Sequence, residues 1–255
     1  MKTYNKFFGF KSIFYFCSLP LRLDSYKGCT FGCLYCFSQS LNNRKEGFHK
    51  EVIPANYKKF SKFMESALLQ ESGNGLLKSC VRKKIPIHFG CVSDPLQPYE
   101  SKKKTTLHLL NILNDFKYPF IFCTKSDLIK KKEYLDIIKK SDVSVQISFS
   151  TLDDRLGKLL EPNAPSPTER LNILKILAEN NIRTVARIQP FIYPKENIKY
   201  STFKKFSEAG VKHIVLEHLR IPTNSRIKTR KKLWSALEMD ILDEYKKLGV
   251  KFSRV

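Results

Sequence analysis

The sequence has little of what marks several classes of protein. Its 255 residues include only 10 glycines and 12 prolines, and 42% of them are hydrophobic, which excludes a disordered, collagen-like or low-complexity chain. It contains no run of about 18 uncharged apolar residues, so we expect no segment to span a membrane. The apolar stretch 7–21 is interrupted by Lys11 and lacks a small-residue cleavage site, which argues against a signal peptide. We therefore expect a cytoplasmic protein.

Cysteine is scarce as well. The seven cysteines are odd in number and too few for a disulfide scaffold. Three of them, Cys29, Cys33 and Cys36, fall within eight residues. In a cytosolic chain, such clustering indicates metal or redox chemistry.

Acidic residues are the third scarcity. The chain has 24 Asp and Glu against 46 Lys and Arg, a formal net charge of +22. A domain this basic attracts polyanions, of which nucleic acid is the commonest, so we expect a nucleic-acid partner. The alternative is a basic surface that only keeps the protein soluble. The basic clusters lie at 58–59, 82–84, 102–104, 130–132 and 226–232.

Short β-rich runs alternate with longer amphipathic segments along the chain. Strands are expected at 17–23, 85–92, 120–124, 143–150, 183–191 and 212–217, and helices at 55–69, 103–116, 127–140, 167–180 and 198–209. Such alternation predicts an α/β protein with a parallel sheet and right-handed crossovers. The strands read as near-continuously apolar, which is typical of strands buried on both faces. The pattern alone leaves an open doubly wound sheet and a barrel as alternatives.

We expect one domain over residues 1–255, because no linker or shift in composition divides the chain. Its core covers about 15–220. The remaining residues, 221–255, predict a helix at 231–247 and a strand-like end at 250–254. The chain stops abruptly after that end, which leaves room for a missing C-terminal segment.

The cysteine cluster has the spacing C-x3-C-x2-C, in the stretch CTFGCLYC at 29–36. Three thiolates on a short loop hold three irons of a [4Fe–4S] cluster, and the fourth iron is left for an exogenous chelator. Gly28 and Gly32 allow the loop to curl around the cluster. Structural zinc is the alternative, but it requires a fourth ligand, and neither Cys17 nor His49 shows the usual pairing.

The spacing and position of these cysteines resemble the radical S-adenosylmethionine (SAM) superfamily. Three further motifs resemble its spore photoproduct lyase-like branch, often labelled "DNA repair photolyase". They are CVSDPLQPYE at 91–100, TKS at 124–126, and EPNAPSP at 161–167 followed by Arg170. The resemblance covers about residues 15–220 and implies the partial (β/α)6 barrel of the radical SAM type.

The resemblance also implies the site residues. In parallel α/β barrels the chemistry lies at the C-terminal ends of the strands, and all four motifs fall there or in the loop beyond. Glu161 and Arg187 face the same barrel mouth, as a buried ion pair or as substrate contacts. The implied cluster ligands are Cys29, Cys33 and Cys36, and the implied SAM contacts are Ser93 and Asp94 at the amine, Lys125 at the carboxylate, Ser148 at the ribose or methionyl end, Tyr35 near the adenine and Phe37 beside it.

One departure from the superfamily concerns the second strand. The Gly-Gly-Glu that many members carry for the SAM amine is absent, and Ser93-Asp94 occupies its place. Cys91 precedes it and gives C-x-S-D, which is similar to spore photoproduct lyase, where the matching cysteine returns a hydrogen atom to the product radical. The alternative for Cys91 is packing as a small buried side chain. The following PLQPYE fits the wider branch better than the lyase.

These observations predict a radical SAM enzyme with a [4Fe–4S] cluster and SAM as cofactors. Reductive cleavage of SAM then forms a 5′-deoxyadenosyl radical, and the expected substrate is nucleic acid carrying a pyrimidine lesion. The expected partners are nucleic acid and an electron donor such as flavodoxin or ferredoxin. Two alternatives remain: a radical SAM enzyme that acts on a peptide or small molecule, and a non-catalytic Fe–S or zinc module that binds nucleic acid.

Overall fold

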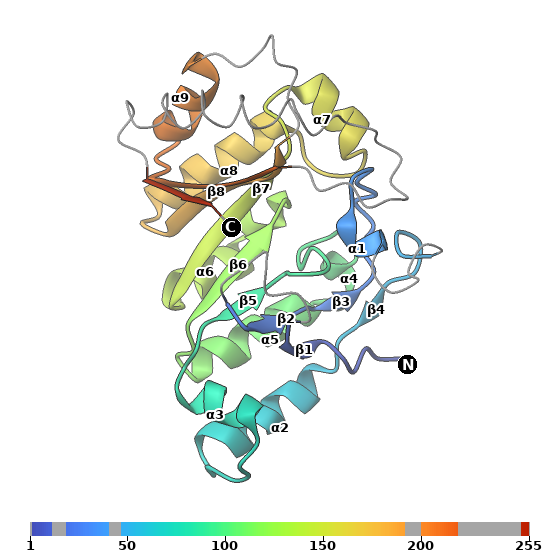
Figure 1. Ribbon diagram of the computed structural model, residues 1–255, viewed down its shortest axis with the longest axis vertical. Helices are drawn as coiled ribbons and strands as arrows, with labels where there is room; N and C mark the ends of the chain where they lie inside the picture. The colour runs from blue at the N-terminus through green and yellow to red at the C-terminus, as the bar shows by residue number, and fades with distance from the viewer. Residues whose placement is uncertain (1, 12–18, 41–46, 192–199, 219–250, 255) are drawn as a thin grey trace. The chain divides into compact units, whose positions relative to one another are not determined.

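The computed structural model describes residues 2–11, 19–40, 47–191, 200–218 and 251–254 (Figure 1). The chain divides into two compact units. Unit 1 comprises residues 1–30, 47–124 and 128–144, and unit 2 comprises residues 31–46, 125–127 and 145–255. The cysteine segment crosses this division, with Cys29 in unit 1 and Cys33 and Cys36 in unit 2. The expected helix at 231–247 lies outside the described residues.

Unit 1 is built around a mostly parallel sheet with the strand order β1-β2-β5-β6. Its strands are β1 (Phe8–Phe10), β2 (Leu21–Leu23), β5 (Ile87–Phe89) and β6 (Phe120–Thr124), and only β1 runs antiparallel to its neighbour. A separate short ladder pairs β3 (Tyr26–Lys27) with β4 (Ile53–Pro54). The helices are α2 (Tyr57–Leu68), α3 (Leu76–Arg82), α4 (Glu100–Lys103), α5 (Thr105–Asp115), most of a 3-10 turn (Asp127–Lys130) and α6 (Lys132–Lys140). Helix α2 packs against α3 and α5, and α5 packs against α6.

Unit 2 contains the end of β7 (Val143–Phe149), then β8 (Arg183–Phe191), β9 (His213–His218) and β10 (Lys251–Arg254), in that order across the sheet. The β8–β9 and β9–β10 pairs are parallel. The helices are α1 (Phe37–Ser40), α7 (Asp154–Leu160), α8 (Pro167–Glu179) and α9 (Tyr200–Glu208). Helix α8 packs on β8, and α7 and α9 pack on α8.

Several strands differ from the sequence prediction in having one apolar face and one largely polar face. In unit 1 the rings of Phe89 and Phe122 meet edge to face with centroids 5.2 Å apart, on the face that also carries Leu23. Since side chains alternate along a strand, Arg22, His88 and Cys123 take the opposite face, together with Ile121. In the part of β7 that belongs to unit 2, buried Val145, Ile147 and Phe149 alternate with Gln146 and Ser148. A polar face is what a barrel-type sheet needs, because polar groups can reach a ligand only where helices do not cover the strands.

The predicted strands at 120–124 and 183–191 recur with the same bounds, whereas other predicted elements are shorter. The strand expected at 85–92 is three residues long, and the helix expected at 103–116 is divided at Lys104, which takes a left-handed conformation with a φ of 51°. The segment 127–140 likewise begins with a 3-10 turn before α6. Helices α1, α3 and α7 have no counterpart in the prediction. None of the described helices is both long and apolar enough to cross a membrane.

Candidate active site

The loop that carries the first cysteine is held within unit 1. Cys29 is 9% exposed, and its amide donates to the Phe48 carbonyl at 3.0 Å. The Nδ1 atom of His49 lies 2.7 Å from the Cys29 carbonyl oxygen and donates to it. Gly28 has a φ of 91°, and a Cβ there would collide with the backbone carbonyl of Glu51. The sequence therefore needs glycine immediately before the first cysteine.

The side chain of Gln97 is hydrogen-bonded to the residues on both sides of Cys29. Its side chain is fully buried, and its Nε2 atom donates to the Gly28 carbonyl at 2.9 Å. Its Oε1 atom accepts the Thr30 amide, also at 2.9 Å. One amide group thus fixes the residues before and after the cysteine, which gives the glutamine of the second motif a positioning role in the loop.

Glu100, the acidic end of the same motif, is a buried carboxylate that organises unit 1. It accepts the hydroxyl of Tyr26, the hydroxyl of Tyr134 at 2.8 Å, and the amides of Thr106 at 2.9 Å and Leu107 at 3.0 Å. Buried carboxylates are costly unless their oxygens are satisfied, and here four donors satisfy them. The motif glutamate therefore joins the first turn of α5 to the strand that precedes Cys29.

Ser93 and Asp94, the expected contacts of the SAM amine, take different positions in unit 1. Ser93 is 4% exposed and its hydroxyl donates to the Tyr26 carbonyl at 2.6 Å. Asp94 is half-buried, and its Oδ1 atom accepts the Leu96 amide at 2.9 Å and the Thr124 hydroxyl at 2.7 Å. The hydroxyl of Ser93 thus serves the framework of the loop, whereas Asp94 ties the second motif to the end of β6.

A buried polar chain on the sheet of unit 1 had no counterpart in the sequence analysis. Lys11 Nζ lies 2.8 Å from Nδ1 of His88, and Nε2 of His88 lies 2.9 Å from Sγ of Cys123. The thiol of half-buried Cys91 donates to the His88 carbonyl at 3.5 Å. These side chains come from segments up to 112 positions apart in the sequence, which is why no local pattern predicts them.

The second half of the cysteine segment is held within unit 2. Cys33 is 9% exposed. The Leu34 amide donates to the Leu160 carbonyl at 2.9 Å, and the Asn163 amide donates to the Phe31 carbonyl at 3.3 Å. The loop between α7 and α8, which carries the fourth motif, therefore fixes the backbone around Cys33.

Cys36 lies directly before α1. Burial raises the pKa of its thiol, and the backbone amides of Gln39 and Ser38 and the charge of Lys125 partly offset that rise. Amides and a cation directed at a sulfur stabilise a thiolate, which is the form that binds iron.

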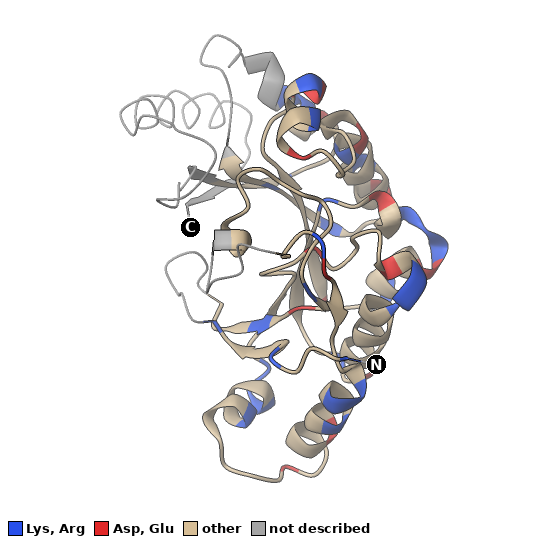
Figure 2. Cartoon of the chain, turned by 90° about the vertical axis from the view of Figure 1, so that its right-hand side faces the viewer, with Lys and Arg blue, Asp and Glu red and all other residues tan. Residues whose placement is uncertain are grey.

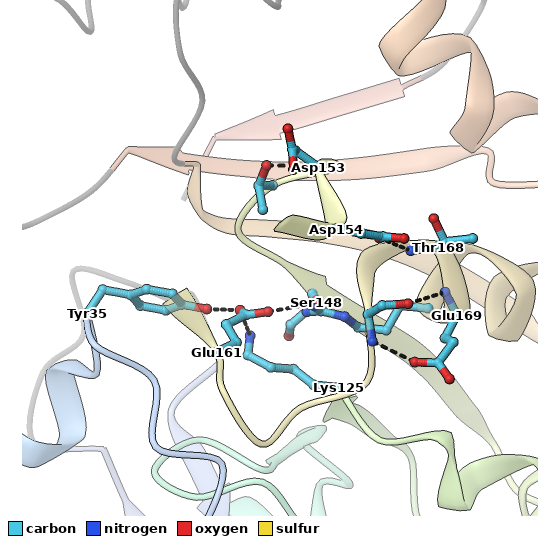
Figure 3. Close-up of polar contacts among 11 residues, drawn as sticks. Tyr35, Lys125, Ser148, Asp153, Asp154, Glu161, Thr168 and Glu169 are labelled. Carbon is cyan, nitrogen blue, oxygen red and sulfur yellow. Dashed lines mark hydrogen bonds and ion pairs between the residues drawn. The ribbon is translucent and has the colours of Figure 1, made fainter. Parts of the chain in front are cut away.

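Glu161 is the centre of an ion network in unit 2 (Figure 3). Its Oε1 atom accepts the hydroxyl of Tyr35 and lies 3.3 Å from Lys125 Nζ, while its Oε2 atom accepts from Arg170. Burial alone would raise the pKa of Glu161, but Lys125, Arg170 and the Tyr35 hydroxyl lower it to about 2. The same burial and the negative charge of Glu161 raise the pKa of Tyr35 well above its ordinary value. Two of the expected SAM residues, Tyr35 and Lys125, thus share one carboxylate oxygen.

The fourth motif explains how the sequence builds this network. Ser166 and Glu169 form a capping box at the start of α8, and Pro167 occupies the first turn. This start places Arg170, whose side chain is fully buried, one turn into the helix, where it also donates to the Ser148 carbonyl at 2.7 Å. Gly157 allows α7 to approach the start of α8 closely, because a Cβ at this position would lie 2.7 Å from the Pro167 ring.

The remaining expected residues are also in unit 2. The ring of Phe37 is 48% exposed, and Ser148 is half-buried. Arg187 does not join Glu161 in an ion pair; it donates to the Gln146 side chain at 2.9 Å. Glu161 instead pairs with Lys125 and Arg170.

The donor set of the cysteine segment fits a [4Fe–4S] cluster. Cys29, Cys33 and Cys36 are not joined in disulfides, and at Cys36 backbone amides are directed at the sulfur. Over the part of the chain that the structure describes, no three His, Cys, Asp or Glu side chains are already gathered around a metal-ion position. Their assignment as ligands therefore stays a prediction from spacing and chemistry.

Several known proteins resemble this chain in sequence or in fold. A relative in Methanocaldococcus jannaschii, an uncharacterized protein, is 27% identical over 179 residues, which cover 70% of this chain and 62% of the relative. Spore photoproduct lyase complexed with dinucleoside spore photoproduct superposes with a TM-score of 0.67 at 14% identity, covering 97% of this chain and 81% of that one. Streptococcus suis SuiB bound to S-adenosylmethionine superposes with a TM-score of 0.65 at 18% identity, covering 94% and 51%. The chain thus spans less than two thirds of the curated relatives it matches.

The two solved structures share the mixed α/β fold with this chain. The sequence model of the radical SAM superfamily matches residues 23–206, which include all four motifs. The chain belongs to the radical SAM superfamily, whose enzymes use a [4Fe–4S] cluster and S-adenosylmethionine.

Proposed function

We propose that this radical SAM enzyme acts on nucleic acid, in a spore photoproduct lyase-like repair of a pyrimidine lesion. The observation that carries the substrate class is the net charge of +22. Lys and Arg recur along the described helices and loops, and Asp and Glu are fewer (Figure 2). Contacts of such side chains to phosphates release counterions and favour nucleic acid over neutral substrates. The likeness to a lyase structure that holds a dinucleoside lesion supports the same class.

When bound, the cluster and SAM supply a 5′-deoxyadenosyl radical that abstracts a hydrogen atom. In the proposal Cys29, Cys33 and Cys36 hold the cluster, and an electron donor such as flavodoxin or ferredoxin reduces it. Lys125 is the proposed partner of the SAM carboxylate, and Ser93 and Asp94 are the proposed partners of its amine. Tyr35, Phe37 and Ser148 line the nucleoside and methionyl ends.

Cys91 is the proposed source of the hydrogen atom that restores the product. Cys91 is half-buried and its thiol donates to the His88 carbonyl, so the S–H group is oriented by the backbone and remains partly accessible. An S–H bond is weaker than most C–H bonds, so a carbon radical of the substrate can take this hydrogen atom. The transfer breaks the S–H bond, forms a C–H bond and leaves a thiyl radical on Cys91. Cys91→Ala is expected to leave SAM cleavage intact and to divert the substrate radical into adducts. A normal ratio of product to 5′-deoxyadenosine in this variant would contradict the assignment.

A peptide is the second candidate substrate, because SuiB, with a similar fold, is also found bound to its precursor peptide SuiA. That likeness, at 17% identity, covers 50% of the SuiB chain, whereas the likeness to the lyase covers 81% of the lyase chain. The basic composition favours nucleic acid over the peptide.

The test is anaerobic reconstitution followed by a 5′-deoxyadenosine assay with dithionite and SAM. The protein is expected to hold about four irons and four sulfides and to form 5′-deoxyadenosine. Ultraviolet-irradiated DNA is expected to raise product formation, and DNA affinity is expected to fall steeply with salt. Loss of SAM cleavage on Cys29→Ala, Cys33→Ala or Cys36→Ala would support the ligand set. An active enzyme that ignores DNA in both measurements would overturn the proposed substrate.

A further inference from the structure

A shallow groove of about 430 Å³ lies between α2 and α5, entirely within unit 1. Its volume is within the range of pockets that hold small organic ligands. The α2 wall presents Tyr57, Lys58 and Lys62, and the α5 wall presents His108 and Asn111. No residue of the groove belongs to the proposed cluster and SAM sites.

The two walls meet through a flat pair of rings. The rings of Tyr57 and His108 are stacked, with centroids 4.2 Å apart and planes inclined by 14°. Tyr57 is half-buried, whereas His108 is exposed. A stacked pair with one exposed member offers a planar surface at the side of the groove, and every nucleobase has a flat face that can stack on such a surface.

The charge of the groove is positive. Lys58 and Lys62 are both exposed and lie one helical turn apart on α2, so their ammonium groups lie on one face. Among the described residues neither lysine has an ion-pair partner. The only acid of the lining, Glu65, already accepts the Ser61 hydroxyl at 2.8 Å. Two cations beside one flat ring pair match the alternation of phosphate and base along a nucleic-acid strand.

Both walls of the groove are tied to the segment that leads into Cys29. Helix α2 follows β4 after two residues, and β4 pairs with β3, where Tyr26 lies opposite Pro54. On the other wall, the Leu107 amide, next to His108, donates to Glu100, which also accepts the Tyr26 hydroxyl. Tyr26 precedes Cys29 by three residues, at most about 11 Å of extended chain. A strand held in the groove would therefore lie at a fixed place relative to the first cluster cysteine.

We propose that this groove is a track for a single strand of the nucleic-acid substrate, with a base stacked on the Tyr57–His108 pair and adjacent phosphates on Lys58 and Lys62. The inference rests on the proposed nucleic-acid substrate. A single strand fits better than a duplex, because the bases of a duplex are stacked on each other and their faces are not available to side chains.

The test measures the affinity of the reconstituted enzyme for a fluorescein-labelled 12-nucleotide single-stranded DNA over a series of salt concentrations. The double variant Lys58→Glu/Lys62→Glu is compared with Lys139→Glu/Lys140→Glu, which makes the same charge change at exposed positions of α6. Loss of two phosphate contacts is expected to reduce the slope of log affinity against log salt by about 1.4. It is expected to weaken binding by at least about tenfold at low salt. The control pair is expected to stay within about threefold of the wild type.

His108→Ala separates stacking from charge, since it leaves both lysines in place at an exposed position. Loss of a base–aromatic stack is expected to weaken binding roughly tenfold or more, with an unchanged salt slope. Heparin and anionic vesicles, which carry charge without bases, are expected to show no effect of this variant. If His108→Ala binds DNA like the wild type, or if the two charge-reversal pairs lose affinity equally, the groove is not the track. If the wild type itself does not bind DNA, the proposed substrate fails first, and the groove inference fails with it.

Discussion

The two units hold their parts of the cysteine segment by different physical means. Unit 1 holds the backbone around Cys29 chiefly with the neutral amide of Gln97, and the ring of His49 donates to the Cys29 carbonyl. Unit 2 holds the backbone around Cys33 with two amide–carbonyl bonds and secures the neighbouring Tyr35 with the buried carboxylate of Glu161. A neutral anchor depends on shape and on satisfied hydrogen bonds, whereas a charged buried anchor depends on the balance of its ions. The Gln97 anchor and the Glu161 anchor should therefore respond differently to loss of charge, to acid and to truncation.

Removing the charge of Glu161 is expected to have the largest effect. Glu161→Gln keeps the shape but leaves the fully buried Arg170 without its counter-ion. Loss of one partner of a buried ion pair destabilises by about 3–5 kcal/mol, measured as the free energy of unfolding in urea. Glu179→Gln, at an exposed position of the same helix, is expected to change it by less than about 0.5 kcal/mol. Equal stability of the two variants would show that unit 2 does not depend on the buried charge.

Acid should destabilise unit 2 for the same reason, because protonation removes the negative charge of Glu161. The pKa of Glu161 is about 2 in the folded protein, below that of an ordinary glutamate, so folding favours its ionised form. Its contribution, on the order of 3 kcal/mol, is fully present above about pH 4.5 and is lost as the pH falls toward 2. The difference in unfolding free energy between the wild type and Glu161→Gln is expected to shrink over this interval. A difference that stays constant from pH 6 to pH 3 would refute the charged anchor.

Truncating Gln97 probes the neutral anchor. Gln97→Ala leaves the Gly28 carbonyl and the Thr30 amide without their buried partner, which is expected to destabilise the protein by about 1–3 kcal/mol. The loss is expected to be the same at pH 3.5 and pH 7, and iron retention after reconstitution is expected to fall because Cys29 is no longer bracketed. Gln70→Ala, at an exposed position, serves as the control for both readouts. A strong pH dependence of the Gln97→Ala effect would remove the contrast between the units.

Lys125 links the charged anchor to the cofactor. Lys125→Met removes one partner of the proposed charge-assisted bond to the SAM carboxylate, so SAM affinity is expected to fall roughly tenfold. Isothermal titration with the reconstituted protein measures this, and iron content is expected to stay normal. Lys175→Met, exposed on α8, is expected to bind SAM like the wild type. Unchanged SAM affinity in Lys125→Met would show that Lys125 serves only Glu161.

The smallest expected effects come from the helix N-caps, one in each unit. The Asn56 side chain accepts the Lys59 amide at the start of α2, and the Ser166 side chain accepts the Glu169 amide at the start of α8, both at 3.1 Å. Asn56→Ala and Ser166→Ala are each expected to cost about 1 kcal/mol in thermal or urea unfolding. Similar losses would show that the units differ in their anchors and not in their local helix stability. A much larger loss for Ser166→Ala would indicate that the capping box also supports Arg170.

The sequence motifs point to Cys29, Cys33, Cys36, Tyr35 and Lys125, and the roles of these residues as cluster ligands and SAM contacts stay predictions. What the sequence could not predict is the framework of hydrogen bonds around them. The expectation of one domain over residues 1–255 stays a prediction. The structure itself divides the chain into two compact units.

The framework depends on long-range pairs that no local pattern contains. Gln97 reaches Gly28 across 69 positions, and Glu100 reaches Tyr26 across 74. Polar faces of the strands were also missed, because single polar residues such as His88 look like interruptions of an apolar run until the neighbouring strands are placed. Short helices such as α3 are missed because seven residues give too little periodicity.

The Oε1 atom of Glu161, which Lys125 shares with Tyr35, competes with any anionic ligand for the ammonium group of Lys125. Before any cofactor arrives, the ammonium group already has a carboxylate 3.3 Å away, tethered by Arg170 and therefore always present at high effective concentration. A free anion must outcompete this internal carboxylate to gain the lysine, and a small inorganic anion brings no other contacts with which to do so. If Lys125 receives the SAM carboxylate, only a ligand whose amine, ribose and adenine bind at the same time would draw the lysine away. Glu161 would then make the site selective for SAM, because it competes with other anions for Lys125 and does not block their entry.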